Sequence, residues 1–300
     1  METPIHRPVL LNEVLEILNP QPGETHIDAT VNGGGHARAI LARIAPSGTL
    51  FGIDRDCELV DVARERVRED AKQNTVILAC GNYRTMQEIA AQHGLSGVDG
   101  ILFDLGFSSH HIERSGRGFS FLKEEPLDMR YNPGENRMTA EEIVNRWPED
   151  TLADIFSRYG EERFAPRIAR GIVRARKARA IRSTEALAEI ITQSVPAVAR
   201  RKRLHPATRT FQALRIAVNE ELESLEQALP AAVSLLAAGG RIAIISFHSL
   251  EDRIVKTFMR SEYKKDTIRI LTAKPVRPEA EEIRANPRAR SARLRAAVKI

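Results

Sequence analysis

A glycine-rich segment after a short apolar run is the first part of the sequence that could do chemistry. It reads Asp28-Ala29-Thr30-Val31-Asn32-Gly33-Gly34-Gly35-His36, and an amphipathic stretch follows it. Glycines let the backbone approach a ligand, and the N–H groups that begin the next helix point toward the acidic end of that ligand. Asp54 ends the next apolar run, 19 residues beyond Gly35, where a carboxylate can accept both ribose hydroxyls of a nucleoside. The loop and the acid together favour a nucleoside cofactor over a purely structural turn.

The spacing of the glycines indicates which nucleoside. Gly33-Gly34-Gly35-His36 does not follow the G-x-G-x-x-G spacing of dinucleotide-binding loops. S-adenosylmethionine fits better because it has no phosphates, so the loop needs to hold only its methionine carboxylate and amine.

A second acid follows a later apolar run, in Phe103-Asp104-Leu105-Gly106. We expect Asp104 at the carboxyl edge of a parallel sheet, beside the cofactor crevice; a turn cap is the alternative role. His36 and His111 are interpreted as cofactor-positioning residues rather than as catalysts. A structural role is the alternative for each histidine.

The elements that would position these residues follow a β-α rhythm. Short β-branched runs alternate with amphipathic stretches at 35–44 and 57–72, which predicts an α/β fold with a parallel sheet. The expected strands are 25–30, 49–54, 75–79, 100–105 and, far downstream, 241–247.

Between residues 105 and 241 the strand pattern stops and helical periodicity replaces it. Helices are expected at 165–178, at 184–194, from about 209 to 229 where Pro230 would end it, and at 231–238 before Gly239-Gly240. The sequence therefore predicts one α/β domain, residues 1–110 and 215–300, interrupted by a helical domain, residues 111–214.

The composition describes a globular chain with two basic stripes. The 300 residues are 42% hydrophobic and 28% charged, with a net charge of +5. No apolar run is long enough for a membrane span or a signal peptide, so we expect a cytoplasmic protein without a membrane partner. Residues 163–182 carry eight basic side chains and no acid, and residues 284–299 carry six and no acid. Such stripes suit a phosphate backbone, although a solvated helix face is the alternative.

The chain has 2 cysteines, Cys57 and Cys80. They are too few for a disulfide framework or a four-ligand zinc site, and a reducing compartment fits them, so we expect no metal.

The motifs now quoted resemble the ribosomal RNA small subunit methyltransferase H (MraW) family across nearly the whole chain. Besides the segments around the glycine loop, Asp54 and Asp104, the matching stretches are His6–Leu11, Gly116–Phe121, Pro126–Arg130, Tyr159–Phe164, His205–Arg215, Ser246–Arg253 and Asn286–Ser291. The later ones are specific to this family rather than to methyltransferases in general.

This resemblance implies a class I, Rossmann-like methyltransferase domain with an inserted helical substrate-recognition domain. It implies S-adenosylmethionine as cofactor and N4 of a cytosine in the decoding region of 16S rRNA as the target, in the small ribosomal subunit; a homodimer is compatible with it. The implied cofactor contacts, taken with the intact loop, are Gly33, Gly34, Gly35, His36, Asp54, Tyr83, Asp104 and His111. The family usually has glycine where Asn32 stands, and asparagine tolerates the left-handed backbone that a glycine loop needs.

The expected chemistry is a direct in-line transfer to the amine, with Asp104 or a neighbouring carbonyl accepting an amine hydrogen. Cys57 and Cys80 stand away from the expected position of Asp104, which disfavours attack at cytosine C5 by a cysteine. Two other classes compete with this prediction: a nicotinamide-dependent dehydrogenase, and an RNA-binding assembly factor with a vestigial cofactor pocket.

Overall fold

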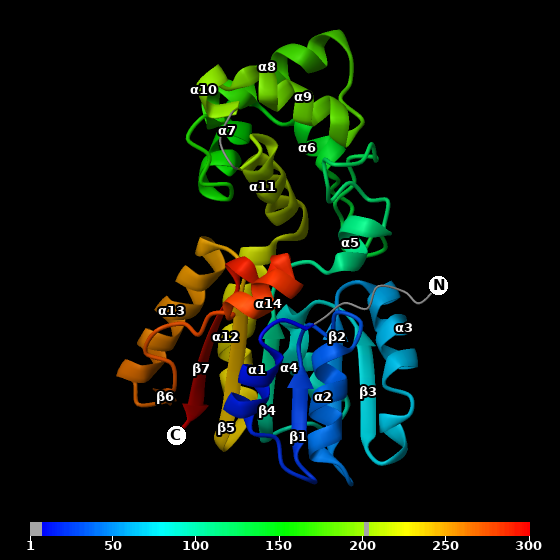
Figure 1. Cartoon of the computed structure of the whole chain (residues 1–300), viewed down its shortest axis with the longest axis vertical. Helices are drawn as coiled ribbons and strands as arrows, with labels where there is room; N and C mark the ends of the chain where they lie inside the picture. The colour runs from blue at the N-terminus through cyan, green and yellow to red at the C-terminus, as the bar shows by residue number, and fades with distance from the viewer. Residues whose placement is uncertain (1–7, 201–203) are drawn as a thin grey trace. The chain divides into compact units, whose positions relative to one another are not determined.

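The computed structural model describes residues 8–200 and 204–300. The chain divides into two compact units, which are described separately (Figure 1). The first comprises Met1–Ser108 and Leu222–Ile300, and the second Ser109–Glu221. The unit boundaries thus fall at 108 and 222, where the sequence predicted 110 and 215.

The first unit is built on a seven-stranded sheet of order β3-β2-β1-β4-β5-β7-β6. All neighbouring pairs among β3, β2, β1, β4 and β5 are parallel, and β7 is antiparallel to both β5 and β6. The order 3-2-1-4-5 is that of the doubly wound nucleotide-binding folds, in which ligands bind where the order reverses, between β1 and β4. The predicted α/β, Rossmann-like fold is confirmed. The strands are β1 Thr25–Asp28, β2 Thr49–Asp54, β3 Thr75–Cys80, β4 Val98–Asp104, β5 Leu236–Ser246, β6 Ile268–Ile270 and β7 Arg293–Lys299.

Helices cover both faces of this sheet, each over its own apolar core (Figure 1). On one face lie α1 (Leu11–Leu18), α2 (Gly35–Ile44) and α3 (Cys57–Arg66), which pack on Leu50 and Leu102. On the other lie α4 (Met86–Gln92), α12 (Glu221–Leu235) and α13 (Ser249–Lys264), which pack on Phe51 and Phe103. Strands covered on both sides must be apolar throughout, which is why they were visible in the sequence. The unit also contains α14 (Ala280–Ala285) and the 3-10 helices Asp70–Lys72, Tyr83–Thr85 and Pro287–Ser291.

The predicted helix ending at Pro230 is wrong. Glu220, with a left-handed φ of 48°, ends α11 (Ala207–Asn219), and α12 then runs through Pro230 to Leu235. The buried face of α12, including Leu225 and Leu229, packs in the sheet core, and this packing outweighs the helix-breaking preference of proline. Gly239-Gly240 lies inside β5, where the pairing with β4 is irregular, and does not follow a helix.

The interpretation of the 284–299 stripe as suited to a phosphate backbone is wrong for its last part. Residues 293–299 form β7, between β5 and β6. Arg295 Nε and Arg293 Nη1 lie 2.6 and 3.1 Å from the carboxylate of Asp252 on α13, and Lys299 Nζ donates to the carbonyls of Ser234 and Leu236. These cations join β7 to α13 and to the junction of α12 with β5.

The second unit is helical, with a single apolar core. The predicted helices over 165–178 and 184–194 are confirmed as α8 (Ala165–Ala178) and α9 (Thr184–Ser194). The other helices described in this unit are α5 (Ser109–Glu113), α6 (Ala140–Arg146), α7 (Glu149–Arg158), α10 (Ala197–Arg200) and α11. In neither unit is any described helix long and apolar enough to cross a membrane.

Candidate functional site

The glycine loop lies between β1 and α2, at the carboxyl edge of the sheet. Asn32, Gly33 and Gly34 have left-handed φ angles of 47°, 82° and 85°. A Cβ on Gly34 would lie 3.3 Å from the backbone of Ala63, so a side chain there would meet both backbone strain and crowding. Gly34 is the residue before α2, whose first N–H groups therefore open toward the loop. The glycine at position 34 is therefore required both by its backbone conformation and by the close packing of α3 on the loop.

Asp54 ends β2 beside this loop and is 8% exposed. Its Oδ2 accepts a hydrogen bond from Asn32 N at 2.7 Å, and its Oδ1 accepts one from Asp56 N at 2.9 Å. Each oxygen keeps a second lone pair, which is where two ribose hydroxyls could donate. Burial raises the pKa of Asp54 to about 7, although the two backbone N–H groups oppose that change. The carboxylate is therefore held in place but incompletely solvated.

Asp104 ends β4, and the same loop reaches it. Asn32 Nδ2 donates to the Asp104 carbonyl at 3.0 Å, and Asp104 N donates to Thr30 Oγ1 at 2.6 Å. Asp104 Oδ2 lies 3.4 Å from His36 Nδ1, whereas its Oδ1 is buried and has no hydrogen-bond partner among the described residues. A buried carboxylate oxygen without a donor is a place where a ligand or a water can supply the missing hydrogen bond.

His36, buried in the first turn of α2, orients Asp104. A carbonyl only accepts hydrogen bonds, so Nε2, 3.0 Å from the Val9 carbonyl, carries a hydrogen. Burial lowers the pKa of His36, but the hydrogen bond and charge of Asp104, together with the charge of Asp28, outweigh it and raise the pKa above 6.5. The protonated ring has N–H groups on both nitrogens, so Nδ1 can donate to Asp104.

Asp28, at the end of β1, is a buried acid that sequence reasoning did not single out. Its Oδ1 accepts from Thr30 N at 3.2 Å, and its Oδ2 is buried without a partner among the described residues. Burial raises its pKa to about 7. Sequence reasoning also missed that Asn32 links Asp54 and Asp104, because its backbone and side-chain donors bind residues of two strands that are far apart in the sequence. The only sequence feature that could have indicated this role is the position of Asn32 in a glycine loop.

The other predicted contacts divide between the units. Tyr83 begins the turn after β3 in the first unit, and its ring packs edge-on against Phe103 with 5.6 Å between centroids. His111 belongs to the second unit, where its ring packs at 4.9 Å from both Phe119 and Tyr131. The structure thus brings Gly33, Gly34, Gly35, His36, Asp54, Tyr83 and Asp104 into one unit, and the role of His111 stays a prediction.

The second unit carries the basic stripe of residues 163–182 on α8 and on the residues that flank this helix. Arg170 and Arg182 pair at 3.4 and 4.0 Å with acids from other helices of the unit, as a solvated surface would. In contrast, the exposed cations Arg167, Arg174, Lys177 and Arg179 have no ion-pair partner within residues 8–200 and 204–300.

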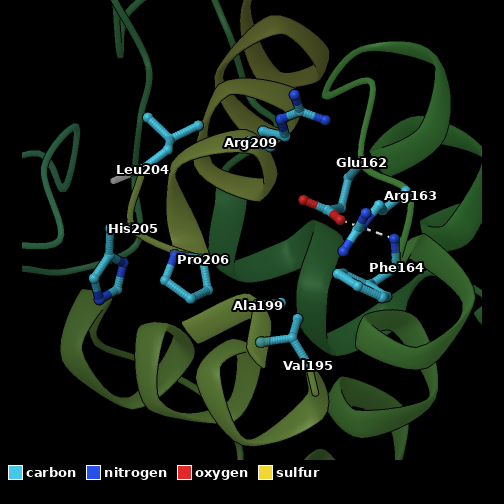
Figure 2. A pocket seen from close by; sticks show the side chains of 9 residues that line it. All are labelled: Glu162, Arg163, Phe164, Val195, Ala199, Leu204, His205, Pro206 and Arg209. Atoms are coloured by element: carbon cyan, nitrogen blue, oxygen red, sulfur yellow. Dashed lines mark hydrogen bonds between the residues drawn. The ribbon is translucent and has the colours of Figure 1, made fainter. Parts of the chain in front are cut away.

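A cavity of about 230 Å³ opens in the same unit (Figure 2). Arg163 and Arg209 line it, with Phe164 and His205. The Arg163 guanidinium stacks 4.4 Å from the centre of the Phe164 ring. Cations together with flat rings suit a polyanion that carries bases.

An open α/β sheet with a glycine loop after its first strand and a buried acid at the end of the next strand belongs to the class of folds that bind nucleosides. A model of the MraW methylase family matches residues 3–300, so the chain belongs to that family. Its cofactor is S-adenosylmethionine, and the two unpartnered carboxylate oxygens of Asp28 and Asp104 fit a cofactor that is itself cationic.

Two curated relatives illustrate the similarity, and both are named ribosomal RNA small subunit methyltransferase H. The one from Heliobacterium modesticaldum is 46% identical, covering 98% of each chain. The one from Geobacter sulfurreducens is 49% identical, covering 98% of this chain and 99% of the relative. The solved structure of a SAM-dependent O-methyltransferase from Thermotoga maritima aligns with a TM-score of 0.44 at 10% identity, covering 100% of this chain and 68% of the other.

Proposed function

We propose that the protein methylates the N4 amine of a cytosine in the decoding region of 16S rRNA, in the small ribosomal subunit. The names of its relatives support small-subunit rRNA as the substrate. The observation that carries the choice of an amine is the free Oδ1 of Asp104, a buried hydrogen-bond acceptor at the end of β4.

S-adenosylmethionine supplies the methyl group as an electrophile. The residues proposed to hold it are Gly33, Gly34, Gly35 and His36 at its amino-acid end, Asp54 at its ribose, and Tyr83, Asp104 and His111 around them. Asp104 Oδ1 accepts a hydrogen of the amine, which aligns the nitrogen lone pair with the methyl carbon and gives the released proton a destination. His36 contributes by holding the other oxygen, so that the carboxylate cannot rotate away.

The cysteines support an amine target over ring carbon C5. Attack at C5 uses a cysteine thiolate as nucleophile, and the chain has only Cys57 and Cys80. Both lie at the β2–β3 side of the sheet, with their sulfurs bonded to each other, while Asp104 ends β4. Neither sulfur is available for that chemistry in this state.

The helical unit is proposed to recognise the RNA. A base can be methylated only when it is unstacked, so the enzyme must hold the strand on either side of it. The unpaired cations of α8 and the arginine-lined cavity suit the phosphates and bases of a single-stranded segment.

The test is mass mapping of 16S rRNA nucleosides from cells that lack the protein, followed by methylation of that RNA in vitro. Loss of one N4-methyl group on a decoding-region cytosine, restored by the wild-type protein and not by Asp104→Asn, is the expected result. An unchanged methylation map, or loss of a C5-methyl group, would overturn the assignment. Parallel reactions on free 16S rRNA and on assembled subunits identify the form that the enzyme accepts.

A further inference from the structure

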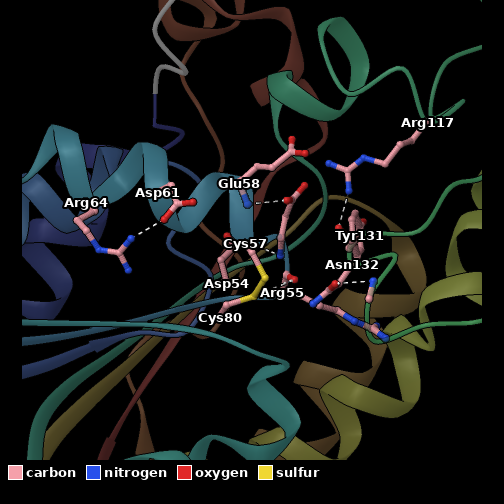
Figure 3. Close-up of a disulfide and its surroundings, with 12 residues drawn as sticks. Asp54, Arg55, Cys57, Glu58, Asp61, Arg64, Cys80, Arg117, Tyr131 and Asn132 are labelled. Carbon is pink, nitrogen blue, oxygen red and sulfur yellow. Dashed lines mark hydrogen bonds and ion pairs between the residues drawn. A yellow bond between two sulfur atoms is a disulfide. The ribbon is translucent and has the colours of Figure 1, made fainter.

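Cys57 and Cys80 form a disulfide in the first unit, which the sequence, interpreted as fitting a reducing compartment, did not predict (Figure 3). Cys57 is the first residue of α3 and Cys80 the last of β3, and their Cα atoms are 5.1 Å apart. Sequence reasoning treated the two separately because 23 residues divide them. Parallel pairing of β2 with β3 brings them together.

The disulfide lies next to Asp54, the acid that we assign to the ribose of the cofactor. In the sheet register Cys80 is the direct partner of Asp54, and Cys57 follows Asp54 by three positions. The Asp54 carbonyl accepts from Gly81 N at 2.8 Å, and Cys80 Sγ lies 3.8 Å from the Arg55 carbonyl. The bond therefore ties the turn that carries Asp54 to the turn that begins at Gly81 and carries Tyr83.

Both cysteines are exposed residues at the surface of the unit, where a soluble thiol can approach them. Cys57 also lies at the N-terminus of a ten-residue helix, where the negative charge of a thiolate is stabilised. These are the features of a disulfide that exchanges with solution thiols rather than one sealed in a core.

We propose that Cys57 and Cys80 are a site of reversible thiol–disulfide exchange that sets the affinity of the protein for S-adenosylmethionine. The inference rests on the proposed assignment of Asp54 to the ribose. In the oxidised state the cross-link holds the Asp54 and Tyr83 turns in position before the cofactor arrives. In the reduced state only the β2–β3 pairing and its hydrogen bonds hold the two turns, so they keep more freedom, which binding must remove at a cost in affinity.

Reduction of the Cys57–Cys80 disulfide consumes two thiol groups, which come from one small dithiol or from two monothiols. One reductant thiolate attacks a sulfur of the disulfide and displaces the other cysteine as a thiolate, forming a mixed disulfide. A second reductant thiol then displaces the remaining cysteine. The protein gains two electrons and two protons, and the reductant leaves as its disulfide.

The experiment is calorimetric titration of the full chain with S-adenosylmethionine, before and after reduction with dithiothreitol. The redox state of each sample is read from the mass added by iodoacetamide to free thiols. We expect the oxidised protein to bind about three- to tenfold more tightly than the reduced protein. Reoxidation with glutathione disulfide should restore the tighter binding.

Cys57→Ser and Cys80→Ser should each bind like the reduced protein and no longer respond to dithiothreitol. The double variant is the matched control, because these are the only cysteines in the chain and any remaining response is a reagent effect. Equal affinity of the fully oxidised and fully reduced wild-type protein overturns this inference alone. Two alkylatable thiols after exposure to glutathione disulfide also overturn it. Failure to bind in either state overturns the cofactor assignment, and this inference with it.

Discussion

The buried position of Asp54 makes a prediction about how cofactor binding depends on pH. Burial raises its pKa to about 7 in the free protein. Ribose hydroxyls donate hydrogen bonds to a carboxylate, so the complex requires the ionised form. Below pH 7 the cofactor must therefore expel a proton from Asp54 to bind, and its affinity should fall as the pH falls.

The magnitude follows from that pKa. With a value of about 7, roughly nine-tenths of Asp54 is ionised at pH 8 and roughly one-tenth at pH 6. S-adenosylmethionine should consequently bind about tenfold more weakly at pH 6 than at pH 8, a difference of about 1.4 kcal/mol. The change should level off above pH 8.

The assay is calorimetry between pH 6 and pH 8 on the wild-type protein and on Asp54→Asn. The variant should bind more weakly at pH 8, and the wild-type advantage should shrink as the pH falls. Titration of the ligand and of His36 is common to both proteins, and the charge of Asp28 acts on Asp54 less than burial and the backbone N–H groups do, so the difference between the two curves reports mainly on Asp54. Parallel curves would refute the reasoning, because they would mean that Asp54 does not change its ionisation when the cofactor binds.

Three further predictions follow from the other sites. Asp104→Asn should lower the single-turnover rate of methyl transfer far more than it lowers cofactor affinity, because an amide replaces a carboxylate acceptor only in part; a normalised rate within about twofold of wild type, under 0.5 kcal/mol of barrier, would remove Asp104 from the mechanism. Replacing three exposed cations of α8 with glutamine should weaken RNA binding and flatten its salt dependence, whereas an equal charge change on α13 should not. If the α8 variant and the wild-type protein show the same slope of log affinity against log salt, the α8 cations do not contact RNA. The α8 set is Arg167, Arg174 and Lys177, and the α13 control set is Lys256, Arg260 and Lys264. Asp252→Asn should reduce the free energy of unfolding by about 1 to 3 kcal/mol, since it leaves the buried Arg295 unpaired, while Asp61→Asn in an exposed pair should change it by less than about 0.5 kcal/mol. Burial alone would raise the pKa of Asp252, but Arg295 and Arg293 outweigh it and lower that pKa in the folded state. The stability that Asp252 contributes should therefore be present above the unfolded pKa of 3.8 and be lost as the pH falls through the folded value. Urea unfolding at several pH values measures this loss.

Local pattern was enough to predict the positions of the loop and of both acids. A strand buried on both faces is a continuous apolar run, so its last residue can be read directly, and Asp54 and Asp104 are such residues. Parallel strands all end at one edge, which is why the two acids could be expected together without any knowledge of their contacts. The glycines after β1 needed only their own backbone preference.

The tail and α12 were less predictable because tertiary packing decided them. β7 has two arginines and a lysine among seven residues, and this charge obscured its apolar residues in the sequence pattern. Asp252, 41 to 43 residues away, neutralises Arg293 and Arg295 and allows the strand to enter the sheet. Pro230 ends a helix by local preference, but the apolar face of α12 packs against the sheet and keeps the helix intact.

The sequence by itself determined the residue types of the site and the edge of the sheet where they stand. Only the tertiary structure decided which atoms meet: Asn32 with Asp54 and Asp104, His36 with Asp104, and Cys57 with Cys80. The physical reason is the distance along the chain over which each kind of interaction acts. Burial periodicity and turn preference act over a few residues, whereas each of these partnerships is made by strand order and register between segments that only the folded sheet brings together.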